Sequence, residues 1–462
     1  MTIEISYGAA EVVTGSCHFV KFDDGTKVLV DCGMFQGLDE WKNYEPLGFD
    51  PKEIDYLLVT HGHLDHVGRI PLLYKGGFRG KIIATPATFE LMKIVLLDTA
   101  HLMSEDYATA FKKAQRRGEE ESVKKPLYTK EDVKATLRLP RRNINYGQTI
   151  KLGSNIHVRY KDAGHIIGAA FIEITYRDGN IQKHVVFSGD IGNQQVKLNP
   201  PPQTPFASPN VFVESTYGDR LHKDYASSVA EFKEAVLKTL KHNGSVLIPS
   251  FAIERTQQLL CILGQMSRKG ELPHHTEVFL DSPMAIKTTK VYEKYKYLLS
   301  DYCKNLHEPF SFPNLRFATT TNASKRINGK KGPMIIIAGS GMCNGGRILH
   351  HFKHRIWDKR NTVIFVGYQA EGTLGREIIE GAQFIEIYGE RIKVNAQIYT
   401  INGFSAHADQ KELTNWLSAI DGLKKIFLIH GEEDKQHIFK KHLIQTLHKK
   451  VHIVKQGEII HL

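Results

Sequence analysis

Short apolar runs alternate with polar, glycine-containing turns through the first two hundred residues of this 462-residue chain. Runs of this length bounded by turn signals, such as Asp24-Gly25 and Gly179-Asn180, are typical of β-strands. The pattern predicts strands over residues 27–30, 56–59, 81–84, 156–160, 169–176 and 184–187. It also predicts a helix over residues 88–113 that ends in a charged, exposed stretch. We therefore expect a large sheet assembly in this part.

A different alternation begins after the proline-rich segment at residues 199–209, which favours a domain boundary there. Strand-like and helical runs follow one another, as in a parallel α/β sheet. Strands are predicted over residues 211–214, 245–249, 277–280, 334–338, 362–367, 392–401 and 426–430, and helices over 226–240, 254–266 and 409–417. Because single cores stop growing at roughly 250–300 residues, we expect two lobes.

Composition places the chain among ordinary folded proteins. Hydrophobic residues make up 41% and charged residues 24%, and no uncharged apolar run approaches the roughly 18 residues that a membrane span needs. Residues 1–13 have no basic start followed by an apolar stretch, so no secretory signal is expected. These features favour a protein without membrane contact that stays in the cytoplasm.

The net charge of +11 makes a polyanion a natural partner, because a basic surface releases counterions when it neutralises phosphates. A solvated basic face without a nucleic-acid partner accounts for the same charge. Charge alone therefore leaves both interpretations open.

The segment LLVTHGHLDHVGRIP follows an apolar strand and brings His61, His63, Asp65 and His66 within six residues. Residues two apart in an extended loop project the same way, so His61 and His63 can bind one ion while Asp65 and His66 turn towards a second. Imidazole and carboxylate are ligands that zinc favours, and manganese or iron would accept them as well. A metal-dependent hydrolase is the function that this cluster favours.

The HxHxDH motif resembles the signature of the metallo-β-lactamase fold hydrolases, which implies an αββα sandwich. Matching the family's other motifs to this sequence implies further site residues. His165 in DAGHIIGAA would complete the first ion's histidines, Asp190 in VVFSGDIG would bridge both ions, and Asp31 in VLVDCGMFQG would orient a ligand histidine. The expected cofactor is two Zn²⁺ per chain, with Mn²⁺ or Fe²⁺ as alternatives.

Four motifs from Glu214 onwards resemble the β-CASP subgroup of nucleases: ESTYGDR, DSPMA, SGMCNGGRILHH and GYQAEGTLGR. The resemblance implies an α/β cap domain inserted into the first domain, with residues 1–208 as its first part, 209–393 as the cap and 394–462 as the returning part. Within the subgroup the chain is similar to short prokaryotic relatives of the polyadenylation-factor endonuclease.

The subgroup's motifs also imply roles for three residues. Glu214 would be the motif A acid and His407 the motif B histidine, held by Glu214 as a general acid for the leaving oxygen. His430 would be the motif C residue, a ligand of the second ion with Asp65, His66 and Asp190. RNA-directed members resemble this sequence in having histidine at motif C, so single-stranded RNA is the expected substrate.

Glycine-rich turns suggest phosphate contacts, because backbone N–H groups without neighbouring Cβ atoms can approach an anion closely. Ser340, Gly341 and Arg347 in SGMCNGGR, and Arg376 in GYQAEGTLGR, are the candidate RNA contacts. The alternative is that the glycines serve a tight turn alone.

The expected activity is therefore hydrolysis of RNA phosphodiester bonds with a metal-bound hydroxide as nucleophile, in RNA processing or degradation. A DNA nuclease or small-molecule hydrolase on the same fold is the enzymatic alternative, and a non-catalytic RNA-binding scaffold is the other. A homodimer is possible on the family resemblance.

Overall fold

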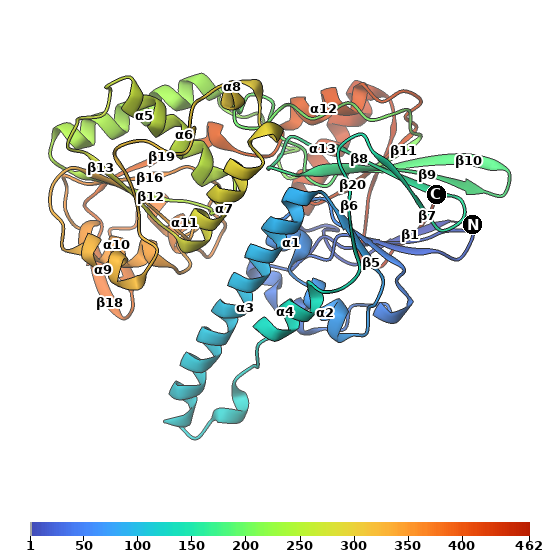
Figure 1. Cartoon of the computed structure of the whole chain (residues 1–462), viewed down its shortest axis with the longest axis horizontal. Helices are drawn as coiled ribbons and strands as arrows, with labels where there is room; N and C mark the ends of the chain where they lie inside the picture. The colour runs from blue at the N-terminus through green and yellow to red at the C-terminus, as the bar shows by residue number, and fades with distance from the viewer. Residues whose placement is uncertain (1) are drawn as a thin grey trace. The chain divides into compact units, whose positions relative to one another are not determined.

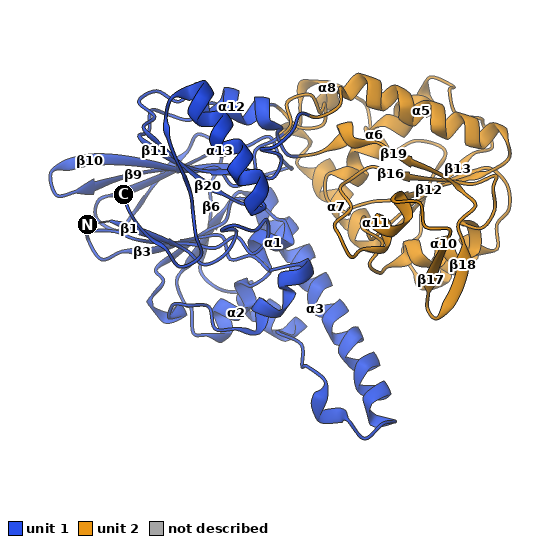
Figure 2. Cartoon of the chain, turned by 180° about the vertical axis from the view of Figure 1, so that it is seen from behind, with its two compact units in different colours: residues 1–192, 201–221, 407–462 blue, residues 193–200, 222–406 orange. Residues whose placement is uncertain are grey.

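The strands expected in the first two hundred residues are all present in the computed structural model, which describes residues 2–462 (Figure 1). The chain divides into two units, coloured separately in Figure 2. The first contains the residues up to Gly192, Pro201–Leu221 and His407–Leu462, and the second contains Asn193–Pro200 and His222–Ala406. The second unit is thus an insertion into the first.

Two seven-stranded sheets form the centre of the first unit. In spatial order, the first sheet contains β22 (Ile459–His461), β1 (Ile3–Ser6), β2 (His18–Lys21), β3 (Lys27–Val30), β4 (Tyr56–Leu58), β5 (Lys81–Ala84) and β6 (Arg141–Asn143). The second contains β21 (Lys450–Ile453), β20 (Lys425–Ile429), β11 (Asn210–Glu214), β10 (Ile181–Phe187), β9 (Ala170–Asp178), β8 (Ile156–Asp162) and β7 (Thr149–Leu152). Their inner faces bury one apolar cluster between them.

Helices cover the outer faces of this sandwich (Figure 2). On the side of the first sheet lie α1 (Leu64–Val67), α2 (Ile70–Lys75), α3 (Pro86–Gln115) and α4 (Lys130–Thr136) (Figures 1 and 2). The short helices of the same part of the chain are η1 (Gly37–Tyr44), η2 (Pro51–Glu53) and η3 (Glu120–Ser122). On the side of the second lie α12 (Gln410–Ser418) and α13 (Glu433–Leu447). Helix α12 starts at a capping box, in which Asp409 and Glu412 satisfy each other's backbone N–H groups.

The second unit contains a six-stranded sheet whose neighbouring strands all pair in parallel. In spatial order its strands are β14 (Leu315–Phe317), β13 (Glu277–Asp281), β15 (Met334–Ala338), β12 (Ser245–Pro249), β16 (Thr362–Phe365) and β19 (Gln397–Thr400). A hairpin of β17 (Phe384–Ile387) and β18 (Glu390–Lys393) is separate. The helical segments are α5 (Tyr225–Lys241), α6 (Arg255–Arg268), α7 (Pro283–Lys294), η4 (Lys296–Leu298), α8 (Asp301–Lys304), α9 (Thr321–Asn328), α10 (Arg347–Arg355), α11 (Leu374–Ile379) and η5 (Asn402–Phe404).

The αββα sandwich with an inserted α/β domain is confirmed, but two details differ from expectation. Strand β11 was expected to open the cap at residue 209, yet it pairs in parallel with β10 and β20 in the first unit. The single strand expected over residues 392–401 is two strands, because the N–H groups of Asn395 and Ala396 donate to the carbonyl of Ile356 and interrupt it. Strand β19 then joins β16, so the inserted unit extends to Ala406 instead of residue 393.

Among residues 2–462, no helix is both long enough and apolar enough to cross a lipid bilayer.

Three phenylalanines lie in register across the second sheet: Phe187, Phe212 and Phe427. Their rings stack with centroid distances of 4.7 and 4.6 Å, and Phe212 is fully buried between the other two. This contact joins β11 and the late strand β20 to β10, so it ties the returning part of the chain to the first part.

We expect Phe212→Ala to lower the free energy of unfolding by about 3–5 kcal/mol, because it leaves a cavity in the middle of this stack. Urea unfolding followed by circular dichroism measures the change. Phe212→Leu is the matched control and should cost less than the alanine variant, because it leaves a smaller cavity. Equal stability of the alanine variant and the wild type would contradict this role of the stack.

Candidate metal centre

The predicted site residues meet at one edge of the sandwich, where parallel strands end. Asp31 follows β3, and His61 and His63 follow β4, which pairs in parallel with β3. Asp190 follows β10, Glu214 ends β11 and His430 follows β20, three strands that also run in parallel. Because the carboxyl ends of parallel strands share an edge, residues far apart in sequence come together there.

The remaining site residues come from loops and a short helix at the same edge. Asp65 and His66 lie in the first turn of α1, and His165 lies in the loop between β8 and β9. His407 lies just before α12, and the backbone there forms an antiparallel bridge with Gly192. All of these residues belong to the first unit.

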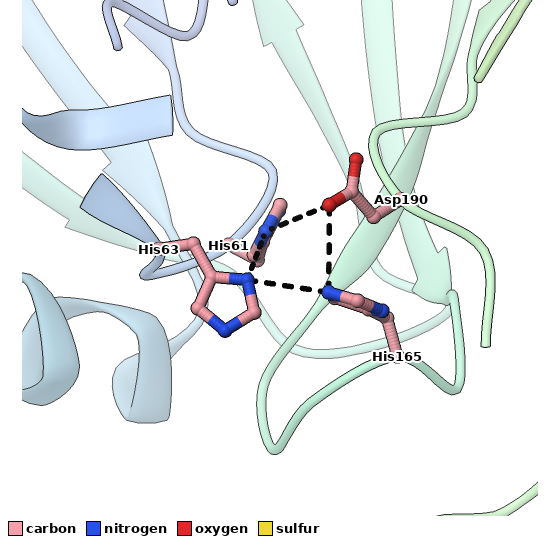
Figure 3. A group of neighbouring side chains, drawn as sticks. All are labelled: His61, His63, His165 and Asp190. Carbon is pink, nitrogen blue, oxygen red and sulfur yellow. Dashed lines mark hydrogen bonds and ion pairs between the residues drawn. The ribbon is translucent and has the colours of Figure 1, made fainter. Parts of the chain in front are cut away.

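One group of donors is formed by His61, His63, His165 and Asp190 (Figure 3). Nδ1 of His63 lies 3.1 Å from Nε2 of His61 and 3.2 Å from Nε2 of His165. Oδ2 of Asp190 lies 3.4 Å from each of those two Nε2 atoms. Three ring nitrogens and one carboxylate oxygen therefore face a common centre.

A second group contains Asp65, His66 and His430, with Asp190 at its side. Nε2 of His66 lies 3.1 Å from Nε2 of His430, which lies 3.5 Å from Oδ2 of Asp65. Oδ1 of Asp190 lies 3.3 and 3.5 Å from the Nε2 atoms of His66 and His430. Asp190 thus presents one carboxylate oxygen to each group.

The donors suit metal ions better than they suit one another. Oδ1 of Asp190 is buried yet has no hydrogen-bond partner, although unpaired buried polar atoms are rare. Facing imidazole nitrogens, together with carboxylate oxygens, form the ligand set that zinc favours. The seven residues of the two groups therefore have the chemistry of metal ligands.

The pKa values of the first donor group are all lowered, both those of its three rings and that of the shared carboxylate of Asp190. Burial, reinforced by the neighbouring ring of His61, lowers the pKa of His63 to about 3. Burial also lowers the pKa values of His61 and His165. The pKa of Asp190 is lowered as well, because the surrounding histidines outweigh the opposing effect of burial. Neutral imidazoles and an ionised carboxylate are the forms that bind metal.

His66 differs from the other rings. Burial acts to lower its pKa, but the carboxylates of Asp190 and Asp31 outweigh burial and raise the pKa well above the usual range. Its Nδ1–H donates to Oδ2 of Asp31 over 2.7 Å, which leaves Nε2 directed at the second group. Asp31 is therefore the partner of this ring, and its role in orienting a metal ligand stays a prediction.

His407 and Glu214 form a pair beside the two donor groups. Nδ1 of His407 lies 3.1 Å from Oε2 of Glu214, and Oε1 of Glu214 accepts a hydrogen bond from the backbone N–H of Ile191. Burial acts to lower the pKa of His407, but the charges of Glu214 and Asp190 outweigh it and raise the pKa to about 9. The side chain of His407 is 21% exposed, whereas that of Asp190 is 1% exposed. His407 is therefore a protonated ring that solvent can reach.

Two threonines that the sequence did not single out complete the orientation of the donors. Thr60 donates its backbone N–H and its hydroxyl to the two oxygens of Asp31, over 2.8 and 2.7 Å. The hydroxyl of Thr216 lies 3.1 Å from Nδ1 of His430. Both residues adjoin motif positions, and that adjacency was the signal available in the sequence.

Two glycines let the loops pack closely enough to bring the donors together. A Cβ atom at Gly33 would lie 1.5 Å from the carbonyl oxygen of Asp65, and one at Gly192 would lie 2.1 Å from that of Gly164. Both glycines therefore hold ligand loops at distances that no other residue permits.

The predicted RNA contacts lie in the second unit and have internal partners. Ser340 accepts a hydrogen bond from the backbone N–H of Asn344 at its hydroxyl, and Gly341 packs on the ring of Phe251. Arg347 donates to Oδ1 of Asp281 over 2.6 Å, and Arg376 donates to Glu380 over 2.6 Å. These bonds give both arginines a structural role, and their contact with RNA stays a prediction.

Comparison with known proteins supports this architecture. Residues 10–250 match the metallo-beta-lactamase superfamily, 256–378 the Beta-Casp domain and 391–454 the Zn-dependent metallo-hydrolase RNA specificity domain. The last segment contains His407 and His430. A crystallised protein of unknown function from Enterococcus faecalis V583 matches over the full length of both chains, with 12% identity and a TM-score of 0.55, which is a likeness of fold.

Relatives with names match over most of the chain. Ribonuclease TTHA0252 of Thermus thermophilus is 41% identical over 93% of both chains. An RNase J-like protein of Methanocaldococcus jannaschii is 32% identical over 98% of both chains. The transcription termination factor FttA of the same organism is 32% identical over 94% of this chain and 67% of its own length.

We expect zinc binding to release about one proton per chain from His66 at pH 7, because a metal ligand must give up the proton on its coordinating nitrogen. The raised pKa means that the proton is present at neutral pH and that its release is lost as pH rises above that pKa. Calorimetric titration in buffers of different ionisation enthalpy counts the protons. Asp31→Asn removes one of the two carboxylates that raise the pKa of His66, so it should release fewer protons than the wild type on zinc binding. Equal proton release by the two proteins would contradict the assignment of the proton to His66.

Proposed function

Because the chain belongs to the metallo-β-lactamase superfamily and carries a Beta-Casp domain, we propose that it is a zinc-dependent ribonuclease that hydrolyses phosphodiester bonds of single-stranded RNA. The observation that carries this proposal is the pair of donor groups that share Asp190, with the protonated His407 beside them. We place two Zn²⁺ at these groups, with His61, His63 and His165 at one and Asp65, His66 and His430 at the other.

When bound, two such ions lower the pKa of a water molecule and stabilise the negative charge that develops on the attacked phosphoryl group. The chain's own residues provide the geometry. Asp190 sets the spacing of the two groups, and Asp31 and Thr216 fix the rings of His66 and His430 through their Nδ1 atoms. Asp65 adds a carboxylate to the second group, where it can also accept a proton from the attacking water.

His407 is the proposed general acid. Its Nδ1–H donates to Glu214, which leaves the Nε2–H to protonate the departing oxygen. The pKa of about 9 keeps this ring protonated at neutral pH, and the 21% exposure of its side chain lets a substrate approach. Glu214 acts as a positioning residue because it fixes the ring and favours its charged form.

RNA is favoured over other substrates by two observations. The segment that contains both His407 and His430 matches an RNA specificity domain, and a relative with 41% identity is named a ribonuclease. The net charge of +11 suits a polyanionic substrate. Ser340, Gly341, Arg347 and Arg376 remain the proposed RNA contacts, and a cytoplasmic homodimer remains the proposed state.

A direct test uses the zinc-loaded protein with end-labelled single-stranded RNA, with DNA of the same sequence, and with a chromogenic β-lactam. We expect cleavage of RNA alone, and loss of cleavage in Asp65→Ala and His430→Ala. Cleavage of DNA or of the lactam at a higher rate would favour the enzymatic alternatives. Tight RNA binding without cleavage under any of Zn²⁺, Mn²⁺ and Fe²⁺ would favour a scaffold and overturn the proposal.

We expect His407→Ala to slow single-turnover cleavage by about 10²–10⁴-fold with little change in RNA affinity, because the variant loses a proton donor and keeps the donor groups. In the wild type, a group with a raised pKa is active below that pKa, so the rate should fall as pH rises through about 9. Glu214→Gln removes the charge that raises this pKa and should move the alkaline fall to lower pH. An unchanged pH profile in Glu214→Gln would exclude His407 as the acid.

A further inference from the structure

A row of buried polar side chains lies on the first sheet of the first unit, on and beside strands β1 and β2. Ser6 on β1 and His18 on β2 are direct cross-strand partners, and the Ser6 hydroxyl lies 2.7 Å from Nδ1 of His18. The same hydroxyl donates to Oε1 of Glu4 over 2.7 Å, and that oxygen lies 3.5 Å from Nδ1 of His18. The strand pairing thus places three polar residues in one column.

Burying this column of polar side chains costs free energy. Glu4 and Ser6 are fully buried, His18 is 2% exposed, and Oε2 of Glu4 has no hydrogen-bond partner. The ring of His18 packs 5.8 Å from that of Phe187, a residue of the apolar cluster between the sheets. Buried ionisable groups can often be replaced by apolar residues of similar volume without loss of stability. Folding alone therefore does not explain these side chains.

The other end of the column leads to the candidate metal centre. The Ser16 hydroxyl lies 3.4 Å from Nε2 of His18 and 3.5 Å from Oδ2 of Asp31, the oxygen that accepts from Nδ1–H of His66. A cavity of about 10 Å³ is lined by all four of these residues and by Thr60. That volume suits one water molecule, and the lining offers the two to four polar partners that a buried water needs.

We propose that Ser16, His18, Ser6 and Glu4 form a positioning column that holds the carboxylate of Asp31 in place and thereby orients His66 for the metal ion of the second donor group. The column rests on the proposed function, since it acts through a metal ligand. All four members are buried, and each acts through the next.

The physical reason lies in the bonding of Asp31. Thr60 and His66 contact its carboxylate at 2.7–2.8 Å, and Ser16, the end of the column, adds a longer contact of 3.5 Å to Oδ2. Without the Ser16 contact, Thr60 and His66 alone would hold the carboxylate, and its position would be less closely fixed. Partners that orient a ligand in this way typically change metal affinity by about 10–100-fold.

The test replaces the column with apolar residues in the variant Glu4→Leu/Ser6→Ala/His18→Phe. Ser16→Ala cuts the link to Asp31 and leaves the other three residues in place. Tyr176→Phe is the matched control, because it removes a buried hydroxyl without a hydrogen-bond partner from the same core. The readouts are urea unfolding of the metal-free proteins and zinc affinity measured by chelator competition without RNA.

We expect the triple variant to unfold at the same or a higher urea concentration than the wild type. Zinc affinity of the donor group that contains His66 should fall about tenfold in both the triple variant and Ser16→Ala, whereas that of the His61, His63 and His165 group stays unchanged. Tyr176→Phe should change neither affinity. The single variant His18→Gln keeps an amide that can face Ser16. Its zinc affinity should therefore stay closer to that of the wild type than to that of the triple variant.

Unchanged zinc affinity at both groups in Ser16→Ala would overturn the column, and this result does not depend on the folding of the triple variant. Equal loss at both groups would overturn it too, because a general loss of structure would explain the change. RNA cleavage by the wild type tests the proposed function separately, so failure of the column leaves that proposal standing.

Discussion

The carboxylate of Asp190 is the constraint on which the site depends. Its two oxygens lie 3.3–3.5 Å from the Nε2 atoms of four histidines, two in each donor group. Histidine rings at these distances would repel one another if they were all protonated. A buried carboxylate without neighbouring donors would cost much free energy. The negative charge and the surrounding rings therefore stabilise each other, and the geometry of both groups follows from where β10 ends.

A rigid apolar frame makes this arrangement possible. The stacked rings of Phe187, Phe212 and Phe427 hold three strands in register, and each strand delivers a site residue at or just beyond its carboxyl end. Interiors that are packed this closely shift little, so the donors are already positioned before a metal ion or a substrate binds. The inserted unit interrupts the chain between β11 and β20, yet the two strands pair along five residues.

The polar groups at and around the donors are almost all buried. His407 is partly exposed, whereas nearly all of the donors are buried, as are Asp31, Thr60 and the column from Ser16 to Glu4. Hydrogen bonds link several of these groups, from Thr60 to Asp31, from Asp31 to His66 and from Glu214 to His407. A hydrolase that must hold several histidines in one orientation needs such bonds, because each ring can otherwise rotate freely about its side-chain torsions.

The sequence by itself determined the type of fold and predicted the donors. Alternating apolar runs identified the strands, and the spacing of His61, His63, Asp65 and His66 predicted metal ligands, since these signals are local in the chain. The limits of the inserted unit were not predictable in the same way: β11 and β19 both read as strands, and only pairing partners far away in sequence decided which sheet each joins.

Tertiary structure alone decided how the donors meet and what supports them. Nε2 of His66 lies 3.1 Å from Nε2 of His430, although the two residues are 364 positions apart in the sequence. The raised pKa of His407 requires Glu214, which is distant in sequence at the end of β11. The roles of Gly33, Gly192 and His18 likewise depend on which backbone or side chain lies opposite. Residue type sets what a side chain can donate or accept, but distance and burial determine which partner it has, and those quantities exist only in the folded chain.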